Sequence, residues 1–182
     1  MNNLKWKVCG SEYIHKGPWA TLRYDKCEMP DGRIVDEYYV LEYPNWVNAV
    51  AITQEGKVLM VRQYRHAAEI VSLEIPGGVI DGDEKPIDAM RRELLEETGY
   101  QFDDIELIAT IYANPSTANN HTYCYLAKGG KKVQGQKLDE HEELVVEEYT
   151  IAEVKQLLFD NKIAQALHCS ALFYALHKLG EL

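Results

Sequence analysis

One stretch, GGVIDGDEKPIDAMRRELLEETGY, constrains this chain more than any other part of it. Pro86 can occupy the first position of a helix, and Gly99 can end that helix as its C-terminal cap. Along the helix, Glu93 lies three residues before Glu96 and four before Glu97, so the three carboxylates share one side. Like charges one turn apart destabilise a helix by roughly 0.2–0.5 kcal/mol per pair. The sequence therefore predicts a helix whose clustered charges are compensated from outside it.

Two explanations of this acidic side are open. Carboxylates held together can share a divalent cation, and oxygen ligands suit Mg²⁺ or Mn²⁺. The alternative is a solvated acidic face with Arg91 and Arg92 as local partners. The pattern around the helix, described below, favours the metal.

Composition limits the class of protein. The chain has 182 residues, of which 46% are hydrophobic, which suffices for one compact domain extended by a small N-terminal element. A formal net charge of -10 argues against a nucleic-acid binder. Four well-separated cysteines without a Cys-x-x-Cys pair fit a reducing compartment, and no segment is long and apolar enough to cross a membrane. We therefore expect a cytoplasmic protein with a small-molecule substrate and neither nucleic acid nor membrane as partner.

The chain divides into two parts on its pattern of turns and strands. Residues 1–46 carry short β-prone runs between Gly and Pro turns, which predicts a small antiparallel β meander with few core residues of its own. Residues 47–182 form the second part, which begins with a hairpin turning at Gln54-Glu55-Gly56. We expect further strands and helices there, at residues 105–112, 121–127, 151–159 and 163–179. A mixed sheet covered by helices, an α/β (α+β) fold, accommodates this order.

The glutamate helix resembles a known motif. Reading from Gly78, the fixed positions match the Nudix box, G-x5-E-x7-R-E-U-x-E-E-x-G-U, and the last apolar position holds Tyr100 as a minor departure. The resemblance implies a Nudix-type α/β/α sandwich with a mixed central sheet. It also implies a set of site residues: metal ligands at Glu93, Glu96, Glu97 and the Gly77 carbonyl, catalytic roles for Glu97 and for Arg92, which orients a glutamate, and structural roles for Gly78, Glu84 and Gly99. The implied cofactor is Mg²⁺ or Mn²⁺.

Sequence outside the box resembles the ADP-ribose pyrophosphatase branch of this superfamily. Pro115 lies sixteen residues after Gly99, the spacing of that branch's marker proline, and VLMVRQYR followed by SLEIPGG is similar to its strand and Glu-x-Pro-Ala-Gly motif. By this resemblance Arg65 and Pro115 belong to the substrate-binding site. A surface arginine at a strand end is the other interpretation of Arg65. In this branch the N-terminal meander is exchanged between subunits, which implies a homodimer; a monomer is the alternative. The resemblance also makes Trp19 the residue that stacks on adenine, and a core aromatic of the meander is the other interpretation of Trp19.

The acidic segment LDEHEEL is similar to the branch's catalytic loop. Matched position by position, Glu140 is the candidate general base and Glu142 a further metal ligand. Glu142 and Glu143 are the alternatives for the base. The alternative is a solvated acidic loop. Two other histidines, His168 and His177, are expected on the surface of the terminal helix.

These features imply Mg²⁺-dependent hydrolysis of the diphosphate bond of a nucleoside diphosphate derivative, ADP-ribose giving AMP and ribose 5-phosphate. The loop NPSTANNHTY departs from the branch's pattern after the proline, so the resemblance does not determine the sugar of the substrate. Two alternatives stand. One is hydrolysis of another diphosphate, such as a GDP-sugar, a dinucleotide or a nucleoside triphosphate, and the other is a non-catalytic ADP-ribose-binding regulator.

Overall fold

The computed structural model describes residues 4–182, so the first three residues of the predicted meander lie outside its described part. The chain forms two compact units. One comprises Met1–Pro44 with Tyr112–Asn120, and the other comprises Asn45–Ile111 with His121–Leu182. Each unit is described by itself.

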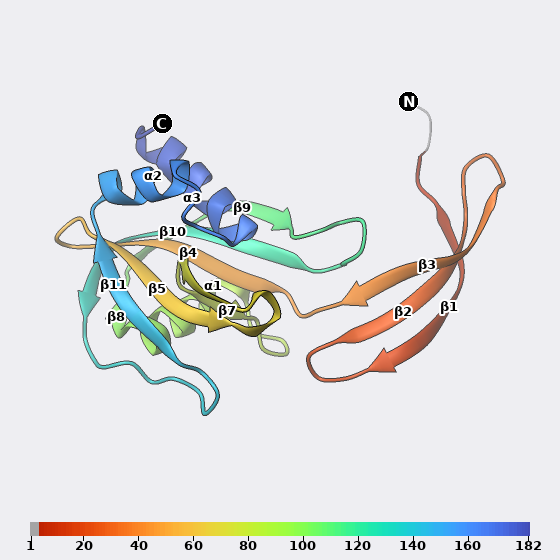
Figure 1. Ribbon diagram of the computed structural model, residues 1–182, viewed down its shortest axis with the longest axis horizontal. Coiled ribbons are helices and arrows are strands. Elements are labelled where there is room, and N and C mark those ends of the chain that lie inside the picture. Colours follow the sequence, from red (N-terminus) through yellow and green to blue (C-terminus); the bar gives the residue numbers. More distant parts are fainter. Residues whose placement is uncertain (1–3) are drawn as a thin grey trace. The chain divides into compact units, whose positions relative to one another are not determined.

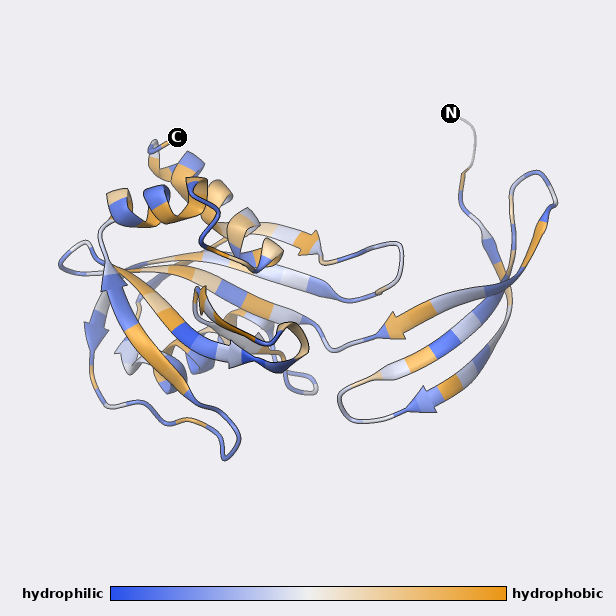
Figure 2. Ribbon diagram, in the orientation of Figure 1, coloured by the Kyte–Doolittle hydropathy of each residue, from blue (hydrophilic) through white to orange (hydrophobic). Residues whose placement is uncertain are grey.

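The smaller unit is built on a three-stranded antiparallel sheet of β1 (Lys7–Lys16), β2 (Thr21–Glu28) and β3 (Ile34–Glu42), in the order β1-β2-β3 (Figure 1). Apolar and polar residues mix along its strands (Figure 2). All of β1 is exposed, and the buried residues of the sheet are Asp25 and Cys27. Arg23 forms a double hydrogen bond with Asp25, at 2.9 and 3.1 Å. The described part of this sheet thus lacks a continuous apolar core.

The larger unit contains one mixed sheet of eight strands. Its path runs β11-β5-β4-β10-β8, with β6 paired to β5, β7 to β4 and β9 to β10. The strands are β4 (Trp46–Thr53), β5 (Val58–Arg65), β6 (Ile70–Glu74), β7 (Gly77–Val79), β8 (Tyr100–Gln101), β9 (Asp104–Tyr112), β10 (His121–Lys132) and β11 (Leu144–Tyr149). The central pair, β4 and β10, runs parallel, whereas β5 is antiparallel to β4. The predicted hairpin and the two later strands are confirmed.

Helices cover both faces of this sheet. One face packs against α1 (Pro86–Glu93) and its continuation η2 (Leu94–Thr98), and the other against α2 (Ile151–Phe159) and α3 (Ala166–Leu179). A short 3₁₀ turn, η1 (His66–Ala68), joins β5 and β6. The unit is therefore an α/β/α sandwich with a mixed central sheet, as the sequence predicts.

Two helix predictions need correction. The last helix begins at Ala166 and not at residue 163. Ile163 is buried in the segment that joins α2 and α3, and the Gln165 side chain caps the helix by accepting from the Leu167 N–H at 3.1 Å. The glutamate helix is not α-helical throughout, since Leu94–Thr98 wind as a wider π-helix. By contrast, α2 has the predicted boundaries and the predicted capping box at its first turn.

Within residues 4–182, no helix has the length and apolar character needed to cross a membrane. All four cysteines are free thiols, and Cys27 and Cys124 are buried.

Candidate active site

The glycines of β7 bring the backbone against the glutamate helix. The Gly77 N–H donates to Glu97 Oε2 at 2.8 Å. A Cβ at Gly78 would collide with the Glu93 carboxylate, and one at Gly77 would collide with the backbone of β4. Glycine at these two positions therefore permits the close approach of strand and carboxylates.

Arg92 links the segment around Val79 and Glu84, which precedes α1, to the glutamates of the helix. Its Nη2 donates to the Val79 carbonyl at 2.9 Å and to Glu84 Oε2 at 3.0 Å. Its Nη1 donates to Glu93 Oε1 at 2.8 Å and to Glu96 Oε2 at 3.3 Å. Arg92 and Glu84 thus hold the loop before α1 onto the helix, and Arg92 orients two of the glutamates.

The buried carboxylates are strongly perturbed. Burial raises the pKa of Glu93 to about 7, which exceeds the opposing effect of Arg92, and the charges of Glu142 and Glu96 also raise it. The pKa of Glu97 lies well above its ordinary value, first because of burial and then because of the charge of Glu93. Carboxylates in this condition are stabilised by any cation that joins them.

Tertiary contacts bring the acidic loop to the same place. The Gln136 side chain donates to the Glu97 carbonyl at 2.8 Å, and the Lys137 N–H donates to the Glu96 carbonyl at 2.8 Å. Gln136 and Lys137, which precede the acidic loop, are therefore hydrogen-bonded to the end of the glutamate helix. Glu142 is half-buried and its charge acts on both buried glutamates.

Glu140 and Glu143 are exposed on this loop, in contrast to Glu142. The loop itself is held by a turn in which the Glu142 N–H donates to the Asp139 carbonyl at 3.0 Å. The structure thus groups Glu142 with the helix glutamates, and it leaves Glu140 on the solvent side of the loop.

The described residues contain no group of three or more Asp, Glu, His or Cys side chains already arranged to hold a metal ion. Glu93 and Glu96 face Arg92, and Glu97 faces the Gly77 N–H. The donor chemistry nevertheless fits a hard divalent cation, because several carboxylates and a backbone carbonyl lie in one neighbourhood. The metal site stays a prediction that requires these side chains to reorient.

Arg65 is held by a carboxylate that sequence reasoning missed. Its Nε donates to Glu74 Oε1 at 2.9 Å and its Nη2 to Glu74 Oε2 at 2.5 Å. Glu74 is 1% exposed; burial acts to raise its pKa, but the hydrogen bond and the charge of Arg65 act against burial, and the pKa is lowered. Arg65 is therefore a positioned side chain and not a loose surface arginine.

The surface assignment of His168 is wrong, whereas His177 is exposed as expected. His168 Nδ1 accepts from the Ile75 N–H at 3.3 Å, and burial lowers the pKa of His168 to about 4. The imidazole is therefore neutral at pH 7 and turned toward the motif that precedes Gly77. An apolar stripe that continued on both sides of His168 was the available signal for its burial.

Trp19 and Pro115 both lie in the smaller unit. Trp19 is 81% exposed, so its alternative role as a core aromatic is wrong, while its role in stacking stays a prediction. The loop that carries Pro115 pairs with β3, where the Leu41 N–H donates to the Thr117 carbonyl at 2.7 Å. A cavity of about 420 Å³ beside this loop is lined by Pro115 and Arg23, among others.

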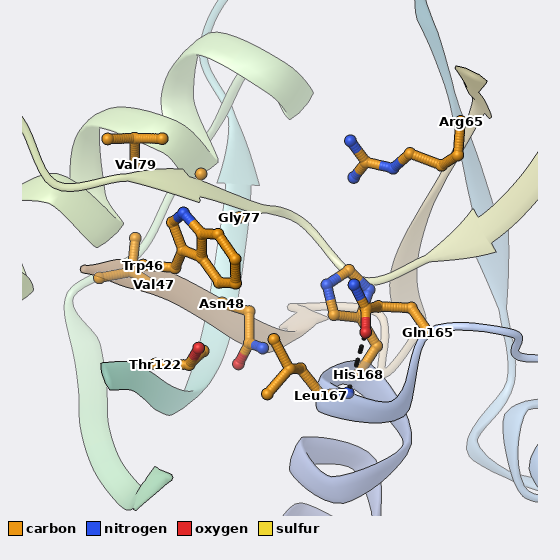
Figure 3. Close-up of a pocket in the computed structure, with 11 residues that line it drawn as sticks. Trp46, Val47, Asn48, Arg65, Gly77, Val79, Thr122, Gln165, Leu167 and His168 are labelled. Atoms are coloured by element: carbon orange, nitrogen blue, oxygen red, sulfur yellow. Dashed lines mark hydrogen bonds between the residues drawn. The ribbon is translucent and has the colours of Figure 1, made fainter. Parts of the chain in front are cut away.

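A second cavity, of about 340 Å³, opens beside Gly77 in the larger unit (Figure 3). Arg65 and His168 line it, together with Asn48 and Thr122 of the two central strands. Sequence reasoning did not single out Asn48 or Thr122. A polar residue inside the apolar run of β4 was the one available signal.

Together, the sandwich fold, the glycine turn and the glutamate helix define the class of protein. Residues 43–168 match the NUDIX domain family, and residues 6–41 match the family described as nucleoside diphosphate sugar hydrolase N-terminal domain. The chain belongs to the Nudix family and is a Nudix pyrophosphohydrolase.

The chain is similar over nearly its whole length to two named relatives. It is 33% identical to a methanol dehydrogenase activator of Bacillus methanolicus over 92% of this chain and 91% of that protein. It is 30% identical to an ADP-ribose pyrophosphatase of Bacillus subtilis over 96% and 94%. The crystal structure of an ADP compounds hydrolase matches with a TM-score of 0.85 over 100% of both chains, at 23% identity, which shows the shared fold.

Proposed function

We propose that this protein hydrolyses the diphosphate bond of a nucleoside diphosphate derivative, with ADP-ribose as the expected substrate and AMP and ribose 5-phosphate as products. The observation that carries the proposal is the pair of buried carboxylates, Glu93 and Glu97, packed against the Gly77–Gly78 turn with raised pKa values. The ADP-ribose pyrophosphatase named among its relatives supports the substrate class.

Several of the site residues are proposed metal ligands. Glu93, Glu96, Glu97, Glu142 and the Gly77 carbonyl would hold Mg²⁺ or Mn²⁺. Bound there, a divalent cation would supply charge neutralisation for the diphosphate and would lower the pKa of a water molecule. In a protein of net charge -10, such a site also removes the repulsion that an anionic substrate would meet.

Three side chains act on the substrate or on the ligands. Arg92 keeps Glu93 and Glu96 oriented through the contacts described above, and Arg65, fixed by Glu74, binds a phosphate or ribose oxygen. Glu140 is the proposed general base. Its exposed position on a loop suits a group that approaches the reacting water after substrate has bound.

In this proposal Trp19 and Pro115 contact the nucleoside of the substrate. Trp19 exposes most of its indole, which suits stacking on adenine, and Pro115 lines the cavity beside the loop. The exposed strand β1 and the scarcity of buried apolar residues in its sheet support a homodimer in which a partner subunit covers this sheet. Four free thiols fit a cytoplasmic location.

The proposal is tested by incubating the protein with Mg²⁺ and a panel of ADP-ribose, GDP-mannose, a dinucleoside diphosphate and nucleoside triphosphates. Phosphate released after coupling to a phosphatase reports cleavage of the diphosphate bond. We expect ADP-ribose to give the highest kcat/KM. Turnover only of another member would move the substrate assignment to that member, and binding of ADP-ribose without any turnover would favour a regulator.

A further inference from the structure

The cavity beside Gly77 lies next to the proposed diphosphate site, where β4 and β10 approach the start of α3. Strand β4 contributes Trp46 and Asn48, strand β10 contributes Thr122, and the start of α3 contributes Leu167 (Figure 3). Its volume of about 340 Å³ is near the lower end of the range for ligand pockets, roughly 300–1,000 Å³. It can therefore hold one moiety of a nucleotide sugar, not the whole molecule.

Two buried polar side chains line this cavity without partners. Asn48 is 2% exposed and Thr122 is 1% exposed. Both polar atoms of the Asn48 amide and the Thr122 hydroxyl have no hydrogen-bond partner in the described structure. Leaving such a group unsatisfied costs about 1–3 kcal/mol. A ligand that supplies the missing hydrogen bonds would recover that cost.

The strand register explains why the two groups lie together. In the parallel β4–β10 ladder, Thr122 is opposite Trp46 and Cys124 is opposite Asn48, so all four side chains share one face of the sheet. Burial raises the pKa of the Cys124 thiol to about 11, while a hydrogen bond with the Asn48 side chain acts to lower it. A neutral thiol is a weak hydrogen-bonding partner, so it does not satisfy the amide.

The charge that lines the cavity is compensated by a carboxylate. Among the described residues that line it, Arg65 carries the one permanent charge, and it is paired with Glu74. His168 is neutral at pH 7, and its Nδ1 already accepts from the Ile75 N–H. An amide and a hydroxyl each offer both a donor and an acceptor, as the hydroxyls of a sugar do. Trp46 and Leu167 provide apolar surface for its carbon atoms.

We propose that this cavity binds the sugar on the far side of the diphosphate from the nucleoside, and that Asn48 and Thr122 hydrogen-bond its hydroxyl groups. This inference rests on the proposed function, which assigns the base to Trp19 and the diphosphate to the glutamate site. Gly77 lines the cavity and its N–H donates to Glu97, so the cavity adjoins the glutamate site. Asn48 and Thr122 are thereby specificity-determining residues for the leaving group.

The test compares each sugar nucleotide with its parent diphosphate in the presence of EDTA, so that no hydrolysis occurs. Calorimetric titration measures the affinities of ADP-ribose, ADP, GDP-mannose and GDP. We expect wild-type protein to bind at least one sugar nucleotide more tightly than its parent diphosphate. The variants Thr122→Val and Asn48→Leu should each weaken that sugar nucleotide about tenfold, the effect of one lost hydrogen bond, and leave the parent unchanged.

Two controls separate recognition from folding. Thr53→Val removes a buried hydroxyl from the other end of β4, outside the cavity, and should change neither affinity. Thr122→Val and Asn48→Leu should melt at or above the wild-type temperature, because each removes a group that the free protein leaves unsatisfied. A structural role for these side chains would instead lower the melting temperature.

Three results would overturn the inference. The first is a wild type that prefers neither sugar nucleotide over its parent. The second is an equal loss for sugar nucleotide and parent in the variants, which would place the nucleoside in the cavity. The third is variants with unchanged affinities. Failure of the proposed function would give a different result. It would appear as absence of turnover in the assay with Mg²⁺, whereas the binding affinities are measured without metal.

Discussion

At the scale of single residues, Glu97 is the side chain on which the site depends most. It is 1% exposed, and burial together with Glu93 raises its pKa. We expect Glu97→Gln to lower kcat by roughly 10²- to 10³-fold, the scale of losing one preorganised electrostatic contact. The unliganded variant should be as stable as the wild type or more so, because the substitution removes a buried like charge.

Thermal melting with and without Mg²⁺ checks this assignment. Ligand binding stabilises the folded state by about 2.7 kcal/mol at a hundredfold excess over Kd. Mg²⁺ should therefore raise the Tm of wild type and of Glu55→Gln, a control at the exposed β4–β5 turn, more than that of Glu97→Gln. Equal shifts in all three proteins would count against Glu97 as a metal ligand.

His168 makes stability depend on pH. Its pKa is about 4 in the folded protein, because burial disfavours the charged imidazole, against about 6.5 in an unfolded chain. Between these values the unfolded state binds the proton and the folded state does not, so stability falls as pH drops from 6.5 toward 4. The loss attributable to His168 is on the order of 3 kcal/mol.

Urea unfolding at pH 7 and pH 4.5 measures this effect. We expect His168→Gln, whose amide can still accept from the Ile75 N–H, to lose less stability between the two pH values than wild type. His177→Gln, on the exposed side of the same helix, should behave as wild type. An identical pH dependence in His168→Gln and wild type would show that His168 does not titrate in this window.

At the scale of elements, the end of the glutamate helix decides where the acidic loop lies. Gly99 has a φ of 75° and ends η2, and a Cβ there would collide with the Gln134 carbonyl. Gly180 has a φ of 74° and ends α3 with open space around it. The two glycines therefore share the same left-handed conformation and differ in how closely other backbone approaches them.

This difference gives a matched pair of variants. Gly180→Ala should cost roughly 1 kcal/mol for the left-handed conformation, and Gly99→Ala should cost about 1–3 kcal/mol more because the backbone of the next segment must move. Activity should fall in Gly99→Ala and not in Gly180→Ala. Chemical denaturation and kcat/KM measure the two effects, and equal destabilisation would mean that the segment yields without cost.

At the scale of the whole molecule, the exposed strand β1 makes the proposed homodimer testable. Light scattering should give the mass of a dimer. Trp19→Ala should remain dimeric and folded while binding ADP-ribose more weakly by about 1–3 kcal/mol, the range for aromatic–base contacts. A monomeric wild type, together with unchanged affinity in the variant, would refute both the dimer and the adenine contact.

The sequence by itself determined the local chemistry and the type of each main element. The spacing from Gly78 to Gly99 identifies the family, and the periodicity of the hairpin and the capping box at Thr150 define elements that the structure confirms. These features depend on neighbours close in sequence, so a linear pattern is enough to reveal them.

Only the tertiary structure decided which distant side chains meet. His168 of α3 is buried against Ile75, and Arg65 of β5 pairs with Glu74 of β6. Asn48 of β4 and Thr122 of β10 lie unsatisfied in one cavity. The π-helical turn at Leu94–Thr98 also follows from packing, since its carbonyls are bonded by the segment at Gln136 and Lys137. Register and burial between distant segments set these contacts, and no local pattern in a single sequence encodes them.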